Sequence, residues 1–298
     1  MKHLLKLEGM PSAAMEEILA SAEVIKAKRG GGEAKPLDGQ TWAMIFTKSS
    51  TRTRVSFEVG IRELGGSVMF LNANDMQLGR GEPIKDTARV LGRMVHGAVI
   101  RTFAQADVEE FAEYSGIPTI NALTDDEHPC QILTDIFTFQ ERRGPIRGKV
   151  VTYVGDGACN VPVSWVHAAA ALDFELRIAA PAEFQPSAET LAKAGGHIVC
   201  TEDVRSAVEG ADMVYTDVWV SMGMEAEAEA RLAKLAGYQI NGGLMCLAKP
   251  DALVMHCLPA YRGKEIDAET FEAHADTIFT QAENRLHTQK AVLAWLAG

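Results

Sequence analysis

Residues 46–58 read Phe-Thr-Lys-Ser-Ser-Thr-Arg-Thr-Arg-Val-Ser-Phe-Glu, and in this stretch a buried strand gives way to a helix. The apolar run 42–46 predicts the strand. Beyond it, Phe57, Ile61 and Leu64 recur at helical spacing. Alternating apolar positions there would also fit a strand, but the long run without a turn residue favours a helix. The chain therefore opens its first sheet with a strand, a turn and a helix.

The turn between these elements is unusually polar. Its five residues supply three hydroxyls and two arginines, at Ser50, Thr51, Arg52, Thr53 and Arg54. A helix start presents free backbone N–H groups and the positive end of the helix dipole. Hydroxyl donors and a guanidinium at that place form a site for a phosphate-like dianion. One hydroxyl would be enough to cap the helix, so we favour an anion site.

Composition limits the classes of protein to consider. The 298 residues are 47% hydrophobic, which suits two α/β domains or one large one. A net charge of −11 disfavours a nucleic-acid or anionic-membrane surface. The sequence has neither an apolar run of about 20 residues nor the apolar region of a signal peptide. The five cysteines form no CxxC pair, which predicts a reducing, cytoplasmic location and no disulfide framework.

Strand-like and helical patterns alternate along the chain. Strands are expected at 42–46, 67–71, 98–101, 118–120, 150–154, 176–178, 197–199, 213–217 and 253–255. Helices are expected at 11–28, 53–64, 84–94, 132–141, 165–172, 189–194 and 284–296, with 277–280 preceding the last. This alternation predicts an α/β fold of two domains, each a parallel sheet with helices on both faces.

The expected domains are 1–133 and 134–282, with the last helix, 283–298, packing back on the first. Residues 142–145, Arg-Arg-Gly-Pro, read as the link. The polar segment 72–83 is longer than an ordinary connection and is a candidate functional loop. Polar clusters follow nearly every strand, where open α/β sheets place their ligands. We therefore expect an active site in the cleft between the domains.

Gly155-Asp156-Gly157 follows a strand and raises the possibility of a dinucleotide site. However, Asn160 occupies the place of the third glycine, and no acidic residue ends the next strand, 176–178. A nucleotide-dependent oxidoreductase is therefore disfavoured.

Six motifs occur in the order found in one known family. They are Ser50-Thr51-Arg52-Thr53, His128-Pro129-Cys130-Gln131, the 155–160 loop, the segment 217–223 (Asp-Val-Trp-Val-Ser-Met-Gly), His256-Cys257-Leu258-Pro259 and Arg285. On these motifs the chain resembles the aspartate/ornithine carbamoyltransferase family over almost its whole length. The segment 217–223 is similar to the loop of the members that use ornithine.

The resemblance implies a transferase with a defined set of site residues. Carbamoyl phosphate would be bound by Ser50, Thr51, Arg52, Thr53, Gln77, Arg101, His128, Gln131, Cys257, Leu258 and Arg285. Ornithine would be bound by Asn160, Asp217, Ser221 and Met222. Among these residues, the catalytic ones would be Arg52, His128, Cys257 and Arg285. The resemblance implies no metal and no organic cofactor, because carbamoyl phosphate is already activated.

The family loop that contains Gln77 reaches into a neighbouring subunit, so a homotrimer with shared sites is expected. Ornithine and citrulline would place the chain in arginine metabolism, with synthesis and breakdown both open.

Two positions depart from the family pattern. Cys159 replaces the first of two asparagines, and the ornithine contact is therefore assigned to Asn160. Ser49 stands where some relatives carry proline. The alternatives are a carbamoyltransferase for another amine, such as putrescine or an acylated ornithine, and a non-catalytic ligand-binding relative. The segment 217–223 opposes the first alternative. Arg52, His128 and Cys257 oppose the second.

Overall fold

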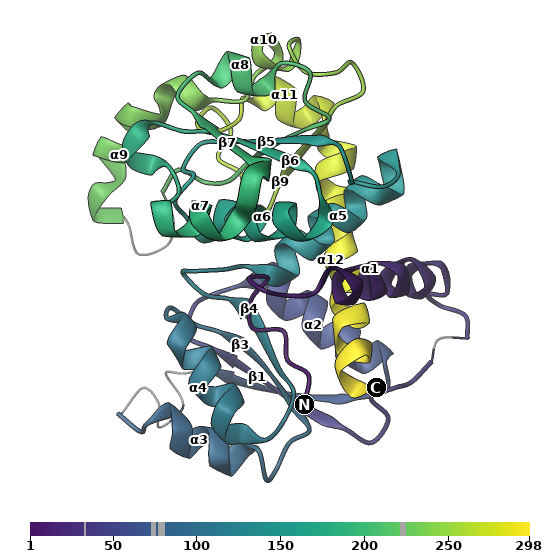
Figure 1. Ribbon diagram of the computed structural model, residues 1–298. Helices are drawn as coiled ribbons and strands as arrows, with labels where there is room; N and C mark the ends of the chain where they lie inside the picture. Colours follow the sequence, from purple (N-terminus) through teal and green to yellow (C-terminus); the bar gives the residue numbers. More distant parts are fainter. Residues whose placement is uncertain (33, 73–75, 77–80, 221–224) are drawn as a thin grey trace. The chain divides into compact units, whose positions relative to one another are not determined.

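The computed structural model describes residues 1–32, 34–72, 76, 81–220 and 225–298. Within it, the chain forms two compact units (Figure 1). The first comprises Met1–Phe137 and Glu283–Gly298, and the second comprises Thr138–Ala282. The chain enters the second unit within helix α5 (Pro129–Arg143) and leaves it within helix α12 (Ala275–Ala297).

The first unit is built on a four-stranded parallel sheet with the order β2-β1-β3-β4. Its strands are β1 (Thr41–Phe46), β2 (Ser67–Asn72), β3 (Gly97–Arg101) and β4 (Thr119–Leu123). Its further helices are α1 (Ser12–Ala27), α2 (Thr51–Glu63), α3 (Ile84–Leu91) and α4 (Gln105–Ser115). In Figure 1, α3 and α4 cover one face of the sheet, while α1 and α2 cover the other. Alternate β1 residues, Ala43 and Ile45, pack with Val108 and Phe111 of α4 in one buried cluster.

The second unit is built on a five-stranded parallel sheet with the order β7-β6-β5-β8-β9. Its strands are β5 (Val150–Val154), β6 (Glu175–Ala179), β7 (Ile198–Thr201), β8 (Met213–Thr216) and β9 (Leu253–His256). Its α-helices are α6 (Asn160–Leu172), α7 (Ala188–Ala194), α8 (Val204–Val208), α9 (Ala228–Leu235), α10 (Gly242–Met245) and α11 (Ala268–Ala273). Short 3-10 turns occur at Ala182–Phe184, Gly195–His197, Glu225–Glu227 and Ala236–Tyr238.

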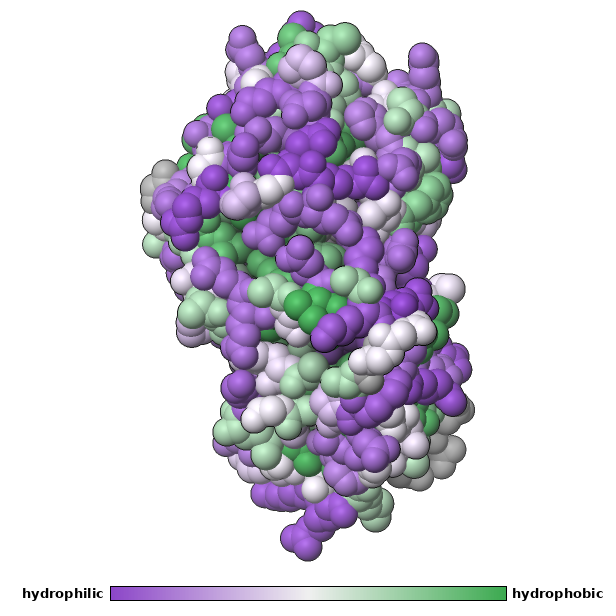
Figure 2. Space-filling view, turned by 90° about the vertical axis from the view of Figure 1, so that its right-hand side faces the viewer, coloured by the Kyte–Doolittle hydropathy of each residue, from purple (hydrophilic) through white to green (hydrophobic). Residues whose placement is uncertain are grey.

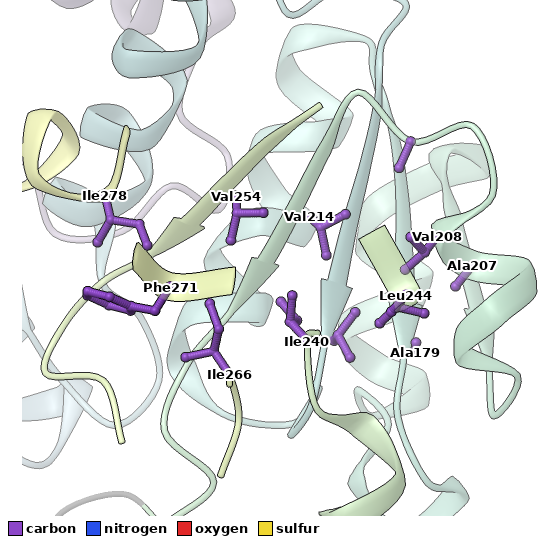
Figure 3. Close-up of a cluster of buried hydrophobic side chains, with 12 residues drawn as sticks. Ala179, Ala207, Val208, Val214, Ile240, Leu244, Val254, Ile266, Phe271 and Ile278 are labelled. Atoms are coloured by element: carbon purple, nitrogen blue, oxygen red, sulfur yellow. The ribbon is translucent and has the colours of Figure 1, made fainter. Parts of the chain in front are cut away.

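A buried apolar cluster fills one face of the second sheet. Figure 3 shows Val214 of β8 and Val254 of β9 facing Ile240, Ile266 and Phe271. Helices α8, α10 and α11 lie on this face, and α6 and α7 lie on the other (Figure 1). Burial of a side chain of this size contributes about 1.5–3 kcal/mol, so the cluster gives the second unit a core of its own.

The predicted fold class, two parallel sheets with helices on both faces, is confirmed. Several local predictions were incomplete. The helices α4, α8, α9, α10 and α11 were not predicted. Residues 277–280 do not precede the last helix but lie inside it, because α12 begins at Ala275. Arg142 and Arg143, expected in a link, form the end of α5.

Each sheet has one point at which the strand order reverses. From β1 the chain moves outward to β2 on one side, and then to β3 and β4 on the other. From β5 it moves to β6 and β7, and then to β8 and β9 on the other side. At such a point the loops after two neighbouring strands diverge and leave a crevice for a ligand. The order therefore predicts ligand sites after β1 and β3, and after β5 and β8.

Hydrophilic residues cover most of the face shown in Figure 2, with hydrophobic residues scattered among them. Within the described ranges, no helix combines the length and the apolar composition that a membrane span requires.

Candidate active site

The turn after β1 begins α2 as predicted. Ser50 is the N-cap residue, and its hydroxyl accepts a hydrogen bond from the Thr53 N–H at 3.3 Å. Ser50 therefore caps the helix, the structural role that a single hydroxyl at this place predicts. Thr51 is exposed and Arg52 is half-buried in the first turn. The remaining N–H groups of that turn, these two side chains and the dipole can still bind an anion.

Helix α12 brings a guanidinium to this turn. Arg285 Nη2 donates a hydrogen bond of 2.7 Å to the Thr53 hydroxyl, and both side chains are buried. The approach is possible because Gly60 of α2 has no side chain: a Cβ there would lie 3.1 Å from Lys290 and 3.5 Å from Leu286 of α12. Two residues predicted from separate motifs thus meet in the first unit.

His128 lies beside the same group of cations. It is buried immediately before α5. Burial, and then the positive charges of Arg285 and Arg101, hold the pKa of His128 well below its ordinary value of 6.5. The imidazole is therefore neutral at neutral pH, with one nitrogen able to donate and the other able to accept.

Arg101 is the last residue of β3, next to β1 at the reversal of strand order. Its carbonyl accepts hydrogen bonds from the Thr47 N–H at 2.9 Å and the Thr47 hydroxyl at 3.2 Å. These bonds tie the end of β3 to the turn that carries Ser50 and Arg52. The buried Arg101 side chain adds a second cation beside His128.

Gln131 lies in the first turn of α5 and is fully buried. Its Nε2 donates a hydrogen bond of 2.8 Å to Asp135, while its Oε1 has no hydrogen-bond partner among the described residues. A buried amide oxygen without a donor is costly unless a ligand supplies one. Gln131 is therefore suited to accept an N–H group from a bound molecule.

The motifs gave no indication of Lys48, which holds three loops of the first unit together. Its buried ammonium forms an ion pair with Asp125, after β4, and lies 4.1 Å from the ring centre of Phe103, after β3. The Asp125 N–H donates to the Phe103 carbonyl at 2.8 Å. A lysine two residues before Ser50 thus sets the spacing of the loops that follow β1, β3 and β4.

In the second unit, Asp217 and Cys257 meet. Asp217 directly follows β8, and Cys257 follows β9, the neighbouring strand. The Cys257 thiol donates to Asp217 Oδ1 at 2.8 Å, and the Val218 N–H donates to the same oxygen at 2.7 Å. Asp217 is thus a buried carboxylate with a fixed orientation, suited to bind an ammonium group.

Asn160 is the first residue of α6, after β5. Cys159, in the same loop, is half-buried, and desolvation and then the charges of Asp156 and Asp217 raise the pKa of its thiol well above the ordinary value. Gly157 allows close packing of this loop: a Cβ there would lie 2.6 Å from Ile178. Asn160 follows β5 and Asp217 follows β8, the two strands at the reversal of strand order, so both residues lie at the edge of the sheet where a crevice for a ligand is expected.

A buried ion pair that the motifs did not predict joins these two loops. Arg231 of α9 pairs with Asp156, and its Nε donates to the Trp219 carbonyl at 2.9 Å. Its guanidinium also lies 4.8 Å from the ring centre of Phe184. Loss of one partner would leave a buried charge unpaired, which typically costs about 3–5 kcal/mol. The sequence offers no signal that Asp156 and Arg231 are partners.

Three predicted site residues, Gln77, Ser221 and Met222, lie outside the described residues. Ligand atoms of Asp217, His256 and Cys257 lie within 4.8 Å of one another, a spacing that could hold a metal ion. However, the Cys257 sulfur and both His256 nitrogens already form hydrogen bonds within the protein.

All five cysteines are free thiols.

Family models match nearly the whole chain. The model for the carbamoyl-P binding domain of aspartate/ornithine carbamoyltransferases matches residues 2–141, and the model for the Asp/Orn binding domain matches residues 147–296. An ornithine carbamoyltransferase of Akkermansia muciniphila is 54% identical, with 100% of this chain and 98% of the relative covered. One of Methylococcus capsulatus is 51% identical, with 99% and 98% covered.

Solved structures show the same similarity. The ornithine carbamoyltransferase of Pyrococcus furiosus is 44% identical with a TM-score of 0.92, covering 100% of this chain and 97% of its own. The anabolic ornithine carbamoyltransferase of Campylobacter jejuni is 42% identical with a TM-score of 0.93, with 99% of each chain covered.

Proposed function

The chain belongs to the aspartate/ornithine carbamoyltransferase family, and we propose that it transfers the carbamoyl group of carbamoyl phosphate to the δ-amine of L-ornithine. The products are L-citrulline and phosphate. The observation that carries the proposal is the group formed by Thr53, Arg285 and His128, in which a buried guanidinium and a neutral imidazole lie at a helix start.

In the proposed reaction, the neutral δ-amine attacks the carbamoyl carbon. Negative charge then develops on the carbonyl oxygen, where Arg52, Thr53, His128 and Arg285 would stabilise it. Donors fixed in advance around a developing oxyanion often contribute about 10²–10³ in rate each. His128 suits this role because its depressed pKa keeps it neutral, so it adds a donor without a further repelling charge beside the two arginines.

The phosphate group would be held by Ser50, Thr51, Arg52, Thr53 and Arg101. The N–H groups at the start of α2 and the two guanidiniums offset the charge of the leaving group. The Oε1 of Gln131 would accept from the carbamoyl NH₂ group. The carbamoyl NH₂ group would thus donate to a buried oxygen that has no hydrogen-bond partner among the described residues.

The ornithine end of the site would lie in the second unit. Asp217, fixed by the Val218 N–H and the Cys257 thiol, would bind the α-ammonium group. Asn160, Ser221 and Met222 would bind the α-carboxylate. Cys257 and Leu258 would lie near the carbamoyl group, with the Cys257 thiol close to the attacking amine.

A panel of amines tests the acceptor. We expect ornithine to have by far the highest kcat/KM in a citrulline colour assay, and lysine to be weak. Putrescine lacks the carboxylate and would leave polar groups of the site unpaired, a loss of up to about 10⁴-fold. N-acetylornithine cannot form the ion pair with Asp217. If putrescine matched ornithine, the ornithine assignment would be wrong, although the carbamoyl-phosphate half would stand.

We further propose a homotrimer with shared sites, as the family resemblance of the Gln77 loop implies. An Arg52→Ala chain mixed with a Gln77→Ala chain should then recover activity through hybrid sites that are intact in both residues. Each variant incubated alone is the control. No recovery, with subunit exchange demonstrated by mass spectrometry, would contradict shared sites.

A further inference from the structure

The turn that follows β9 has an unusual backbone. Leu258 has φ of 59°, and among the described non-glycine residues only Leu258 and Asp173 have positive φ. In this left-handed region the Cβ of an L-residue crowds the neighbouring carbonyl, so the conformation is unfavourable for leucine. Such a conformation persists only where surrounding contacts impose it.

His256 supplies one of these contacts. The Leu258 N–H donates to His256 Nδ1 at 2.9 Å. Because Nδ1 accepts this hydrogen bond, the proton of the neutral ring is on the other nitrogen, Nε2. Nε2 lies 3.1 Å from Glu265 Oε1, to which it can donate. The two contacts together fix the tautomer and the orientation of the ring.

Glu265 closes the same loop from its other end. Its side chain is fully buried, and Oε1 also accepts from the Tyr261 N–H at 2.6 Å. The Glu265 backbone is held in turn, because its carbonyl accepts from the Ile240 N–H at 2.9 Å. The carboxylate is therefore a fixed point to which both His256 and the following loop are attached.

The Leu258 turn is connected to Asp217 through one residue, Cys257. Leu258 directly follows Cys257, whose thiol donates to Asp217 Oδ1 at 2.8 Å. A change in the Leu258 backbone can therefore move the adjoining Cys257 side chain relative to Asp217.

We propose that His256 and Glu265 are positioning residues that hold the Leu258 turn and thereby keep the Cys257 thiol on Asp217. The importance of this placement for catalysis rests on the proposed carbamoyl transfer. Displacement of a catalytic group by about 1 Å can reduce the rate by about 10²-fold.

Two substitutions of His256 separate its two hydrogen bonds. In His256→Asn the side-chain oxygen can accept from the N–H two residues further on, as in an Asx turn, but the side chain is too short to reach Glu265. In His256→Gln the longer amide can still donate to Glu265 but offers no matching acceptor to Leu258. His256→Leu removes both bonds.

The Asn and Gln variants should rank in opposite orders by their losses of kcat and of Tm. We expect His256→Asn to keep kcat within about tenfold, and His256→Gln and His256→Leu to lose about 10²-fold in kcat, with smaller changes in KM. The Tm should fall more in His256→Asn than in His256→Gln, because the Asn variant leaves the Glu265 carboxylate buried without its histidine donor. A purely structural role would make kcat follow Tm through the series.

A second readout does not depend on activity. Alkylation of Cys257 by iodoacetamide can be followed by peptide mass spectrometry in the folded proteins. A hydrogen bond to a charged group reduces the fraction of the thiol that is free to react by about tenfold or more. We therefore expect alkylation of Cys257 to be about tenfold faster in His256→Gln, where the bond to Asp217 is lost, than in His256→Asn. The exposed Cys246 thiol is an internal control in each sample.

The outcomes distinguish the two proposals. If the unchanged protein forms no citrulline but Cys257 labelling follows the expected order, the proposed function fails and the positioning role stands. Equal labelling of Cys257 in the Asn and Gln variants, or full kcat in His256→Gln, would overturn the positioning role and leave the proposed function intact.

Discussion

Arg285 donates a hydrogen bond of 2.7 Å to the Thr53 hydroxyl across 232 positions of sequence. The guanidinium comes from the middle of α12, while the hydroxyl lies in the first turn of α2. Both side chains are almost inaccessible, at 3% and 1% exposed. The arginine is therefore oriented by a protein hydroxyl at the place where we propose that the carbamoyl oxygen binds.

Replacement of Thr53 by valine tests this orientation. The valine retains the shape but loses the acceptor for Arg285, and a hydrogen bond to a charged group is worth a factor of roughly 10 to 100. We expect kcat to fall by that factor in the citrulline assay. Thr53→Ser keeps the hydroxyl and is the matched control. Equal activity of the Val and Ser variants would show that the hydrogen bond does not orient Arg285.

Arg52 is assigned to both the phosphate and the carbonyl oxygen. Arg52→Lys keeps the charge but loses the planar fork of donors. We expect kcat to fall by about 10²-fold or more, with unchanged far-UV circular dichroism. Arg54→Lys is the control, because Arg54 is exposed and lies over the Phe70 ring at 3.8 Å. Near-normal turnover in Arg52→Lys would contradict the assignment.

The pH dependence of activity should reflect the substrate amine and not His128. Free amines of this kind titrate near ~10, so the reactive fraction of ornithine grows about tenfold per pH unit around neutrality. The pKa of His128 is held well below 6.5, so the imidazole stays neutral through this range. We expect kcat/KM for ornithine to rise from about pH 6 to 8. A flat profile would mean that amine deprotonation does not limit the reaction.

Glu127 should make folding stability depend on pH. Its carboxylate accepts from the Leu7 and Glu8 N–H groups at 2.7 and 3.2 Å, but burial outweighs these bonds and raises its pKa from 4.5 to about 7. Between these values the folded protein binds more protons than the unfolded chain. The contribution to stability is therefore fully present below pH 4.5 and is lost as the pH rises through about 7.

A shift of this size corresponds to about 3 kcal/mol in the free energy of unfolding. Urea unfolding at about pH 5 and pH 8 measures it. We expect the free energy of unfolding of the unchanged protein to fall by about 2–3 kcal/mol from pH 5 to pH 8, and we expect Glu127→Gln to abolish this decrease. The exposed Glu23→Gln variant should show the same decrease as the unchanged protein. The same pH dependence in both variants would show that Glu127 titrates normally.

The sequence predicted which side chains follow the strands, because strand ends are a local property of the pattern. Arg101 and Asp217 end predicted strands, and Ser50 and Cys257 follow two others within four residues. Their partners could not be predicted in this way. The pairing of Asp156 with Arg231, or of His256 with Glu265, depends on the order of the strands and the paths of the loops, which periodicity does not encode.

The two kinds of error in the helices have different causes. Helix α4 carried a readable signal, since Val108, Phe111, Ala112 and Ser115 are buried at i, i+3, i+4 and i+7. The start of α12 carried no such helical signal. Residues 277–280, Thr-Ile-Phe-Thr, are β-branched or aromatic and locally favour a strand. Burial of Thr277 and Ile278 within the long helix overrides that preference.

The return of residues 283–298 to the first unit has a consequence for the order of events on the ribosome. The sheet of this unit is translated early, but Arg285 and the α12 side chains that pack against Gly60 follow only after all of Thr138–Ala282 has been made. At ~5–20 residues per second that delay lasts on the order of ten seconds or longer. During it the nascent first unit leaves the surface of α2 around Gly60 uncovered by α12. The second unit, whose segment is continuous, can complete its own folding first.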